Sequence, residues 1–304
     1  MTKTLVYAIT DGVSGTPFLT RLIEANLPHA EVHASRAGWL DLGVNSPDAS
    51  HLTRFNTLGN LPEIRRFWRT KLTADLENSA ETLIDLTHQH AKAGLVENLD
   101  LVPDDTRVIL VHLTHDVTAC TWHLHNRCDY RNTGFTWLMG LDPNYRNLCV
   151  PSGQFAAHGM AGLALWYLVE MRVRAVYYRH LVAGMDHVHF TSVSLTELAQ
   201  GAEPAQDLLR LIADDANLDL VPPETPPAPE PKPGGQAPAP GTAAEKLAKA
   251  PRPGDMFGED TKHEVAAMVQ RIKWDAEALG RAYFESGQRL GAQALSGSAS
   301  RAMH

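Results

Sequence analysis

Short apolar runs alternate along this chain with longer segments of helical periodicity. The runs at 4–9, 82–87, 107–113 and 187–193 carry the aliphatic, β-branched and aromatic side chains that are typical of strands. The run at 107–113 is almost uninterrupted, which indicates a strand covered on both faces. Strands that alternate with helices predict an α/β fold, in which a parallel sheet is flanked by helices.

The helical segments have an apolar side chain every three or four residues. They predict helices over 16–27, 61–80, 91–99, 116–127, 156–183 and 208–216. Ser194 and Glu197 have the spacing of a helix cap. Residues 29–60 and 129–153 mix Pro, Gly and Asn with isolated aromatic residues, so loops and short elements are expected there.

A change of composition near residue 221 divides the chain. Residues 222–241 contain nine prolines, which is typical of an extended linker and not of a core. We therefore expect an α/β domain over 1–220, a Pro-rich linker or surface excursion over 221–257, a C-terminal helix over 258–292 that packs on the same domain, and a flexible tail over 293–304.

Bulk composition narrows the class of protein. The 304 residues carry a formal net charge of −8, whereas nucleic-acid-binding domains usually have a basic face, so no nucleic-acid partner is expected. The sequence has neither an apolar run long enough to span a membrane nor a signal sequence, and its three cysteines are too few for a disulfide framework. These features predict a cytoplasmic protein and leave homo-oligomerisation open.

Histidine is abundant, with 15 residues, but no metal site is expected. Carboxylates do not cluster around any of the close histidine pairs, and the sequence contains no His-Glu-x-x-His motif. The pairs are His88/His90, His112/His115, His123/His125 and His187/His189.

The turn after the first predicted strand has the features of a phosphate cradle. Backbone N–H groups at a strand–turn–helix junction can point into one concavity, at the positive end of the helix dipole. Gly12 and Gly15 permit close approach, and the hydroxyl groups of Ser14 and Thr16 add donors. A capped turn without a ligand explains the same residues. The turn lacks the Gly-Lys-Ser/Thr ending of a Walker A loop, so an ordinary ATPase or GTPase is not expected.

Two further motifs follow this turn in order. Residues 84–88 (IDLTH) predict a strand that ends in Thr-His, and residues 108–120 (VILVHLTHDVTAC) predict a strand followed by an Asp-Val helix start. Over roughly residues 4–200, the turn and these motifs resemble the sulfotransferases that use 3′-phosphoadenosine 5′-phosphosulfate (PAPS). The resemblance implies a P-loop-like sulfotransferase architecture, with PAPS as the sulfuryl donor and no metal.

The resemblance assigns the donor site to the turn and to three later positions. The 5′-phosphosulfate would lie against Gly12, Val13, Ser14, Gly15, Thr16, Pro17 and Phe18. The 3′-phosphate would lie against His112 and Cys120, where the family has Arg and Ser, and against Arg252 of an Arg-x-Gly element. Val13 stands where the family has Lys or Arg, the cation that neutralises charge on the leaving group. Both anchors of the donor therefore depart from the family pattern.

His88, at the end of the Thr-His motif, is the candidate general base that would take a proton from the acceptor. A strand-end histidine that bonds a backbone carbonyl explains the same residue. His90 is the second candidate. Glu24 is the third, because some members of the family use a glutamate on the helix after the loop, although a solvated helix face explains it equally well.

The sequence leaves two functions open. The first is a sulfotransferase that moves a sulfuryl group from PAPS to a hydroxyl or amine of a small molecule or glycan. The second is a diverged protein of the same fold that binds an anionic ligand or a protein partner without PAPS-dependent catalysis. Arg172, Arg174 and Arg179 form a basic helix face, which is either solvated or supplies the missing positive charge.

Overall fold

The chain forms one five-stranded parallel sheet with the strand order β2-β3-β1-β4-β5. The strands are β1 Thr4–Ile9, β2 Glu31–His33, β3 Thr82–Asp85, β4 Arg107–Thr114 and β5 Val188–Ser194. The computed structural model describes residues 3–33, 43–126, 141–215, 217–221 and 257–290. The predicted α/β fold, a parallel sheet flanked by helices, is confirmed.

β1 lies at the centre of the sheet, and all six of its residues are buried. Thr4 lies opposite Thr82 of β3 on one side and opposite Arg107 of β4 on the other. Ligands of open α/β sheets bind beyond the carboxyl ends of the strands. The segment after Ile9 leaves the sheet at that edge, between the ends of β3 and β4.

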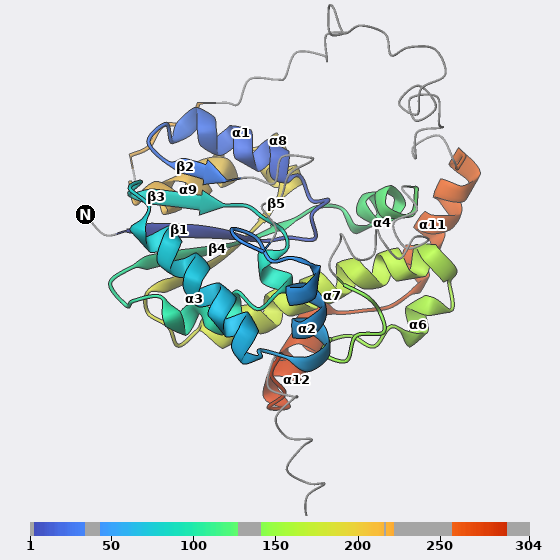
Figure 1. Cartoon of the computed structure of the whole chain (residues 1–304). Helices are drawn as coiled ribbons and strands as arrows, with labels where there is room; N and C mark the ends of the chain where they lie inside the picture. The colour runs from blue at the N-terminus through green and yellow to red at the C-terminus, as the bar shows by residue number, and fades with distance from the viewer. Residues whose placement is uncertain (1–2, 34–42, 127–140, 216, 222–256, 291–304) are drawn as a thin grey trace, which may run out of the picture.

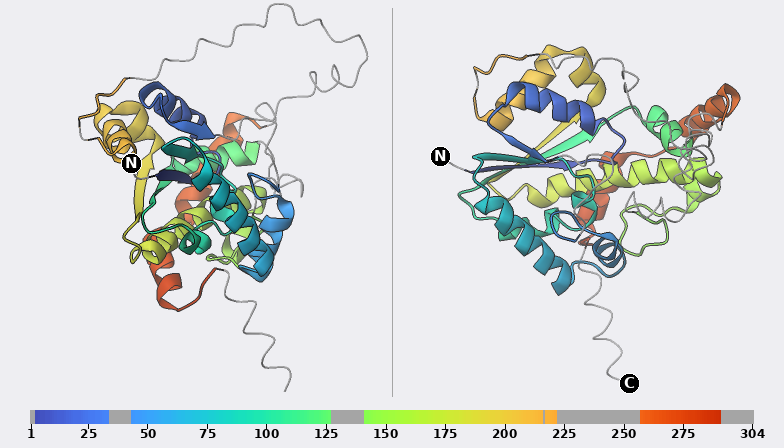
Figure 2. Two further views of the ribbon diagram at one scale, coloured as in Figure 1. Left: turned by 60° about the vertical axis from the view of Figure 1, so that its left-hand side comes forward. Right: turned by 45° about the horizontal axis from the view of Figure 1, so that its top comes forward.

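Helices cover both faces of the sheet (Figures 1 and 2). The helices on one face are α1 Thr16–Asn26, α8 Leu195–Gln200 and α9 Ala202–Ala213. Those on the other face are α3 Pro62–Glu77, α7 Gly159–Val182 and α12 Ala276–Glu285. Alternate residues of β1 therefore enter different cores: Val6 packs with α1 and α9, whereas Tyr7 packs on the side of α7.

Shorter elements surround α7 and the carboxyl edge of the sheet. They are α2 Ala49–Leu58, η1 His90–Lys92, η2 Val96–Leu101, α4 Val117–Asn126, α6 Gly153–Ala156 and α11 Glu259–Arg271. The long helix α7 packs against α4, α6, α11 and α12. Most of its residues are buried, which explains why its apolar side chains are not confined to one face.

An ion pair lies in the middle of α7. Arg174 and Glu170, one turn apart, are both fully buried, and Arg174 Nε donates to Glu170 Oε1 at 2.6 Å. The same carboxylate accepts the backbone N–H groups of Cys149 and Val150. Arg174 also donates to the side-chain oxygen of Asn56 at 2.8 Å. The pair therefore joins α7 to α2 and to the segment before α6.

The structure differs from the sequence prediction where short elements meet. The helix expected over 91–99 is two 3₁₀ turns, because Gly94 between them has φ +92° and packs against Phe55. The C-terminal segment expected as one helix forms α11 and α12, and the side chain of Asp275 caps the second by accepting Ala278 N–H. The loop-rich stretch 29–60 contains β2 and α2.

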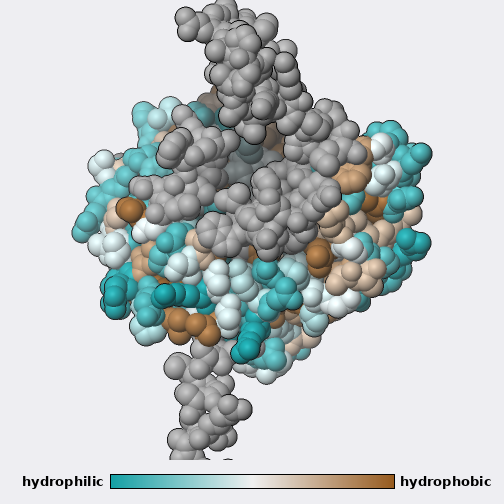
Figure 3. All heavy atoms as spheres, turned by 45° about the vertical axis from the view of Figure 1, so that its right-hand side comes forward, coloured by the Kyte–Doolittle hydropathy of each residue, from teal (hydrophilic) through white to brown (hydrophobic). Residues whose placement is uncertain are grey.

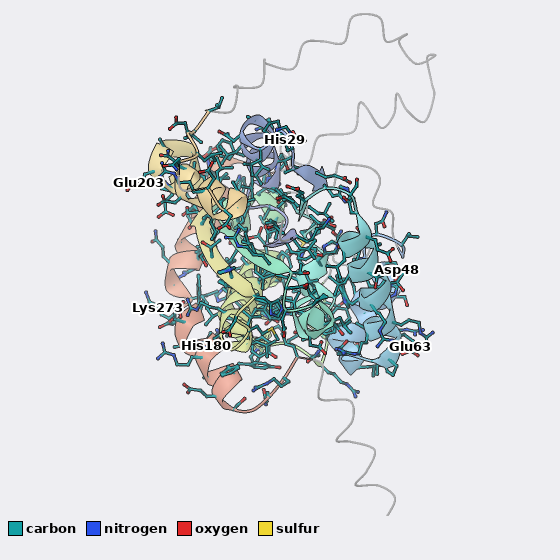
Figure 4. All side chains as sticks on the ribbon, turned by 90° about the vertical axis from the view of Figure 1, so that its left-hand side faces the viewer. His29, Asp48, Glu63, His180, Glu203 and Lys273 are labelled. Atoms are coloured by element: carbon teal, nitrogen blue, oxygen red, sulfur yellow. The ribbon has the colours of Figure 1, made fainter. Side chains whose placement is uncertain are left out.

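On the face drawn in Figure 3, teal and white residues are interspersed with tan and brown ones, which gather mainly on the right. The described large hydrophobic residues that are exposed are Val44, Leu58, Val221 and Leu279. Exposed charged residues such as Glu63, Glu203 and Lys273 lie at the rim of the molecule (Figure 4). Within the described ranges, no helix is both long and apolar enough to cross a membrane.

Candidate functional site

The turn between β1 and α1 is held open by two glycines with positive φ. Gly12 has φ +87°, and Gly15, the residue before α1, has φ +88°. A Cβ on Gly15 would overlap the side chain of Leu195 at the start of α8, and a Cβ on Gly12 would lie 3.0 Å from the His88 ring. Glycine is therefore required at both positions for packing as well as for backbone conformation.

Hydrogen-bond donors at this turn point to a ligand. The backbone N–H groups of Ser14, Gly15 and Thr16 have no acceptor among the residues that the structure describes. Thr16 Oγ1 is buried and has no partner there either. Three amides and one hydroxyl at a helix N-terminus match the donors that bind phosphate and sulfate oxygens. These donors belong to residues that the sequence assigns to the predicted cradle.

Asp11 changes the chemistry of the turn. Its carboxylate accepts the Val13 N–H at 2.8 Å and the Ser14 hydroxyl at 2.8 and 2.7 Å. Ser14 is fully buried. The family resemblance assigns the Ser14 hydroxyl to PAPS, but in the structure this hydroxyl donates its hydrogen bond to Asp11 within the turn. The Asp11 carboxylate also places a negative charge beside the cradle.

His88 and Lys92 lie together at the mouth of the turn. Lys92 Nζ is 2.8 Å from His88 Nδ1 and 3.5 Å from the carbonyl oxygen of Asp11. The Tyr167 hydroxyl also donates to that carbonyl, at 2.5 Å, and Lys92 Nζ lies 5.0 Å from the centre of the Tyr167 ring. Lys92 is fully buried, whereas His88 is partly exposed. His88 thus faces outward with a lysine behind it.

Burial lowers the pKa of Lys92 to about 7. The negative charge of Asp11 opposes this shift, and the positive charge of Arg174 adds to it. A lysine with this pKa is present in both its charged and its neutral form near neutral pH, and the amino group can therefore act as a cation or as a proton acceptor.

Three helices fix the backbone around Lys92. The carbonyl oxygens of residues 91, 92 and 93 accept hydrogen bonds from Tyr178 on α7, Asn56 on α2 and Trp68 on α3, at 2.7, 2.8 and 2.8 Å. These bonds satisfy carbonyls that a 3₁₀ turn leaves unpaired. They also determine where the lysine side chain leaves the backbone.

His112 and Cys120 lie on different sides of the β4–α4 connection. The His112 ring bonds Ser192 of β5, with Nδ1 3.2 Å from Oγ, and lines a cavity of about 280 Å³. Cys120 lies instead against the turn, with Sγ 3.9 Å from the carbonyl oxygen of Val13. Burial, with the nearby charges of two arginines, lowers the pKa of His112 to about 3, so the ring is neutral at physiological pH. Burial raises the pKa of the Cys120 thiol to about 12, helped by Asp11.

Arg172 of α7 is the cation near both of these residues. Its charge contributes to the low pKa of His112 and opposes the rise in the pKa of Cys120. The guanidinium donates to the carbonyl oxygen of His115 at 2.5 Å and lies 5.6 Å from the Trp274 ring centre. Arg172 also lines the cavity beside His112.

The remaining candidates lie away from the cradle or outside the described residues. His90 is fully buried, packs edge-on against Tyr7 and Trp68, and faces Asp85, with Nδ1 3.7 Å from Oδ1. Glu24 is exposed on α1. Pro17 is exposed in the first turn of α1. Phe18, the next residue, packs against the core between α1 and the sheet. Arg252 lies outside the described residues.

Comparison with known proteins adds one distant match. No protein-family model matches the chain, and no curated protein matches it. Among solved structures, the crystal structure of a sulfotransferase from Alicyclobacillus acidocaldarius aligns with 94% of this chain and 96% of that chain, at 10% identity and a TM-score of 0.44. The match spans nearly the whole of both chains. At this identity and TM-score it supports no residue role in this protein.

Metal ligands do not gather in the part of the chain that the structure describes. No three His, Cys, Asp or Glu side chains lie close enough there to hold an ion.

Sequence reasoning did not identify Lys92, Asp11 or Tyr167 as site residues. A signal existed for Lys92, because a single lysine among Ala91, Ala93, Gly94 and Leu95 interrupts an otherwise small and apolar segment. Such a lysine is buried only where a specific partner accepts it. No pattern in the sequence indicates Tyr167, which reaches the turn from the middle of a long apolar helix.

Proposed function

We propose that this protein transfers a sulfuryl group from PAPS to a hydroxyl or amine of a small molecule or glycan. The observation that carries the proposal is the meeting of the open donors of the β1–α1 turn with the His88–Lys92 pair at one edge of the sheet. A cradle for an anionic group and a base beside it are the two parts that such a transfer requires.

The donors of the turn fit the sulfonate or phosphate end of PAPS. The amides of residues 14–16 and the Thr16 hydroxyl would hold its oxygens, and Ser14 would support the turn through Asp11. PAPS supplies an activated sulfuryl group with a phosphate leaving group. The chain supplies orientation, positive potential and a base.

At both positions where the family has a cation and this chain does not, another positively charged side chain lies nearby in space. Lys92 lies beside the turn in which Val13 stands at the family's basic position. Arg172 lies near His112 and Cys120, where the family has Arg and Ser. In the proposed reaction these two side chains provide the charges that neutralise the donor, which explains how the turn tolerates an apolar Val13.

Titration calorimetry with 3′,5′-adenosine bisphosphate tests the proposal. We expect binding with a dissociation constant in the micromolar range, weakened by added salt because the ligand is an anion. Turnover with PAPS and a panel of phenol, amine and sugar acceptors should then identify the acceptor class. Absence of binding at millimolar bisphosphate would rule the proposal out.

Replacing Thr16 by valine is expected to weaken bisphosphate binding by about 10- to 100-fold. The buried hydroxyl has no protein partner among the described residues, and a hydrogen bond to a charged oxygen contributes about 1.5–3 kcal/mol. Valine preserves the shape of threonine, so thermal unfolding should change little. Calorimetry measures the affinity.

Thr20→Val is the matched control, since Thr20 lies one turn further along α1 and its hydroxyl bonds the Thr16 carbonyl at 3.0 Å. Its affinity should equal that of the unmodified protein. Equal affinity in the Thr16 variant as well would show that the ligand does not use this hydroxyl.

Asp11 favours a second candidate, an anion-binding protein without sulfuryl transfer. Its carboxylate occupies the Ser14 hydroxyl and adds negative charge beside the cradle, which opposes binding of a multiply charged donor. Under this alternative a singly charged ligand would bind more tightly than the bisphosphate. Calorimetry with both ligands separates the two functions.

A further inference from the structure

We infer that His88 and Lys92 work as one proton-sharing pair, in which a neutral Lys92 accepts the Nδ1 proton of His88, so that Nε2 is the unprotonated nitrogen that a base requires. This inference rests on the proposed function for its catalytic meaning. The pair itself is a statement about two side chains of the free protein.

The geometry allows two arrangements of protons. His88 Nδ1 and Lys92 Nζ are 2.8 Å apart, so one hydrogen lies between them. If Lys92 is an ammonium, it donates to Nδ1, and the neutral ring must carry its own proton on Nε2. If Lys92 is an amine, its lone pair accepts the proton on Nδ1, and Nε2 is unprotonated. Only the second arrangement makes the partly exposed edge of His88 a base.

The surroundings of Lys92 make the amine form accessible. The side chain is fully buried, and its neighbours include His88, Asp11 of the turn, and Tyr167 and Arg174 of α7. Asp11 favours the ammonium, while burial and Arg174 favour the amine, and the net result is a pKa of about 7. The carbonyl oxygen of Asp11 accepts an N–H in either form, so both forms keep that contact.

The transfer step balances with this arrangement. The acceptor O–H bond breaks as its oxygen bonds the sulfur, its proton moves to His88 Nε2, and the S–O bond to the leaving phosphate breaks. The ring becomes an imidazolium, and its Nδ1 proton can pass to Lys92, which takes up the positive charge next to the turn. Proton release to water restores the pair. Lys92 is thus a positioning residue that acts through His88.

Nitrogen NMR of the full chain tests the pair directly. With ¹⁵N-labelled histidine, and His88 assigned by comparison with His88→Gln, we expect the Nδ1–H form of His88 above pH 8. As Lys92 takes up a proton with a midpoint near 7, that form should convert to the Nε2–H form. Loss of turnover below pH 7 should follow the same midpoint. An Nε2–H ring at pH 8.5 overturns the inference.

Lys92→Arg separates this role from that of a simple cation. Arginine stays charged and can only donate to Nδ1, so we expect the Nε2–H form wherever the ring is neutral and a loss of turnover of about 100-fold or more. Lys92→Met should likewise lose the Nδ1–H form. Lys273→Met, which removes an exposed lysine, should change neither quantity. Full turnover in the arginine variant, or an unchanged tautomer in the methionine variant, contradicts the pair.

The NMR experiment needs no donor and no turnover, so the two proposals fail separately. Absence of bisphosphate binding with an Nδ1–H ring removes sulfuryl transfer and leaves the pair intact. Bisphosphate binding with an Nε2–H ring removes the pair and leaves sulfuryl transfer intact. If a Lys92 variant does not fold, the His88 tautomer measured in the unmodified protein is enough to support or reject the pair.

Discussion

Replacing His88 by alanine is expected to lower kcat by about 10²- to 10⁴-fold, the usual contribution of a general base. His88 is the partly exposed imidazole at the mouth of the turn, whereas His90 is enclosed in the core. Binding of the bisphosphate should change by less than a few fold, because the donors of residues 14–16 remain. Steady-state kinetics with PAPS, together with calorimetry, measures the two effects separately.

His29→Ala provides the control for this prediction. His29 is exposed after the end of α1 and lies at the rim of the molecule (Figure 4). Its removal should leave kcat unchanged. A His88 variant that retains more than about half of the turnover would exclude His88 as the base.

Replacing Glu170 by alanine is expected to lower the free energy of unfolding by about 3–5 kcal/mol. The substitution leaves the Arg174 guanidinium buried without its carboxylate and removes the acceptor of two backbone N–H groups. Urea unfolding followed by circular dichroism measures the change.

The double variant Glu170→Gln/Arg174→Met tests the cause of that loss. Removing both charges leaves no unpaired ion in the core, so the double variant should be more stable than Glu170→Ala. If the double variant is at least as unstable as the single one, lost packing and not the unpaired charge explains the effect.

Apolar runs and helix starts in the sequence determined most of the fold. β1 and β4 were predictable because central strands of a parallel sheet are apolar on both faces. β2 was not, since it has three residues, none of them fully buried. α12 begins at a single capping aspartate, Asp275. The hydrophobic periodicity of the sequence does not show where one helix ends and the next begins.

The candidate site was only partly predictable, for a physical reason. The glycines and hydroxyls of the turn are contiguous in sequence, and their spacing shows what backbone they form. The cations are distant from the turn in sequence, because Lys92 comes from η1 and Arg172 from α7. The motifs therefore predict the cradle but contain no cation at Val13 or His112, whereas tertiary packing brings Lys92 beside the turn and Arg172 near His112.

The three hydrogen bonds to the carbonyls of residues 91–93 have a consequence for folding. Their donors lie on α2, α3 and α7, which contribute residues from 56 to 178. The backbone position from which the lysine reaches the turn thus depends on all three helices in the folded state. A substitution that loosens any one of these helices is therefore expected to disturb the lysine as well as the packing of that helix.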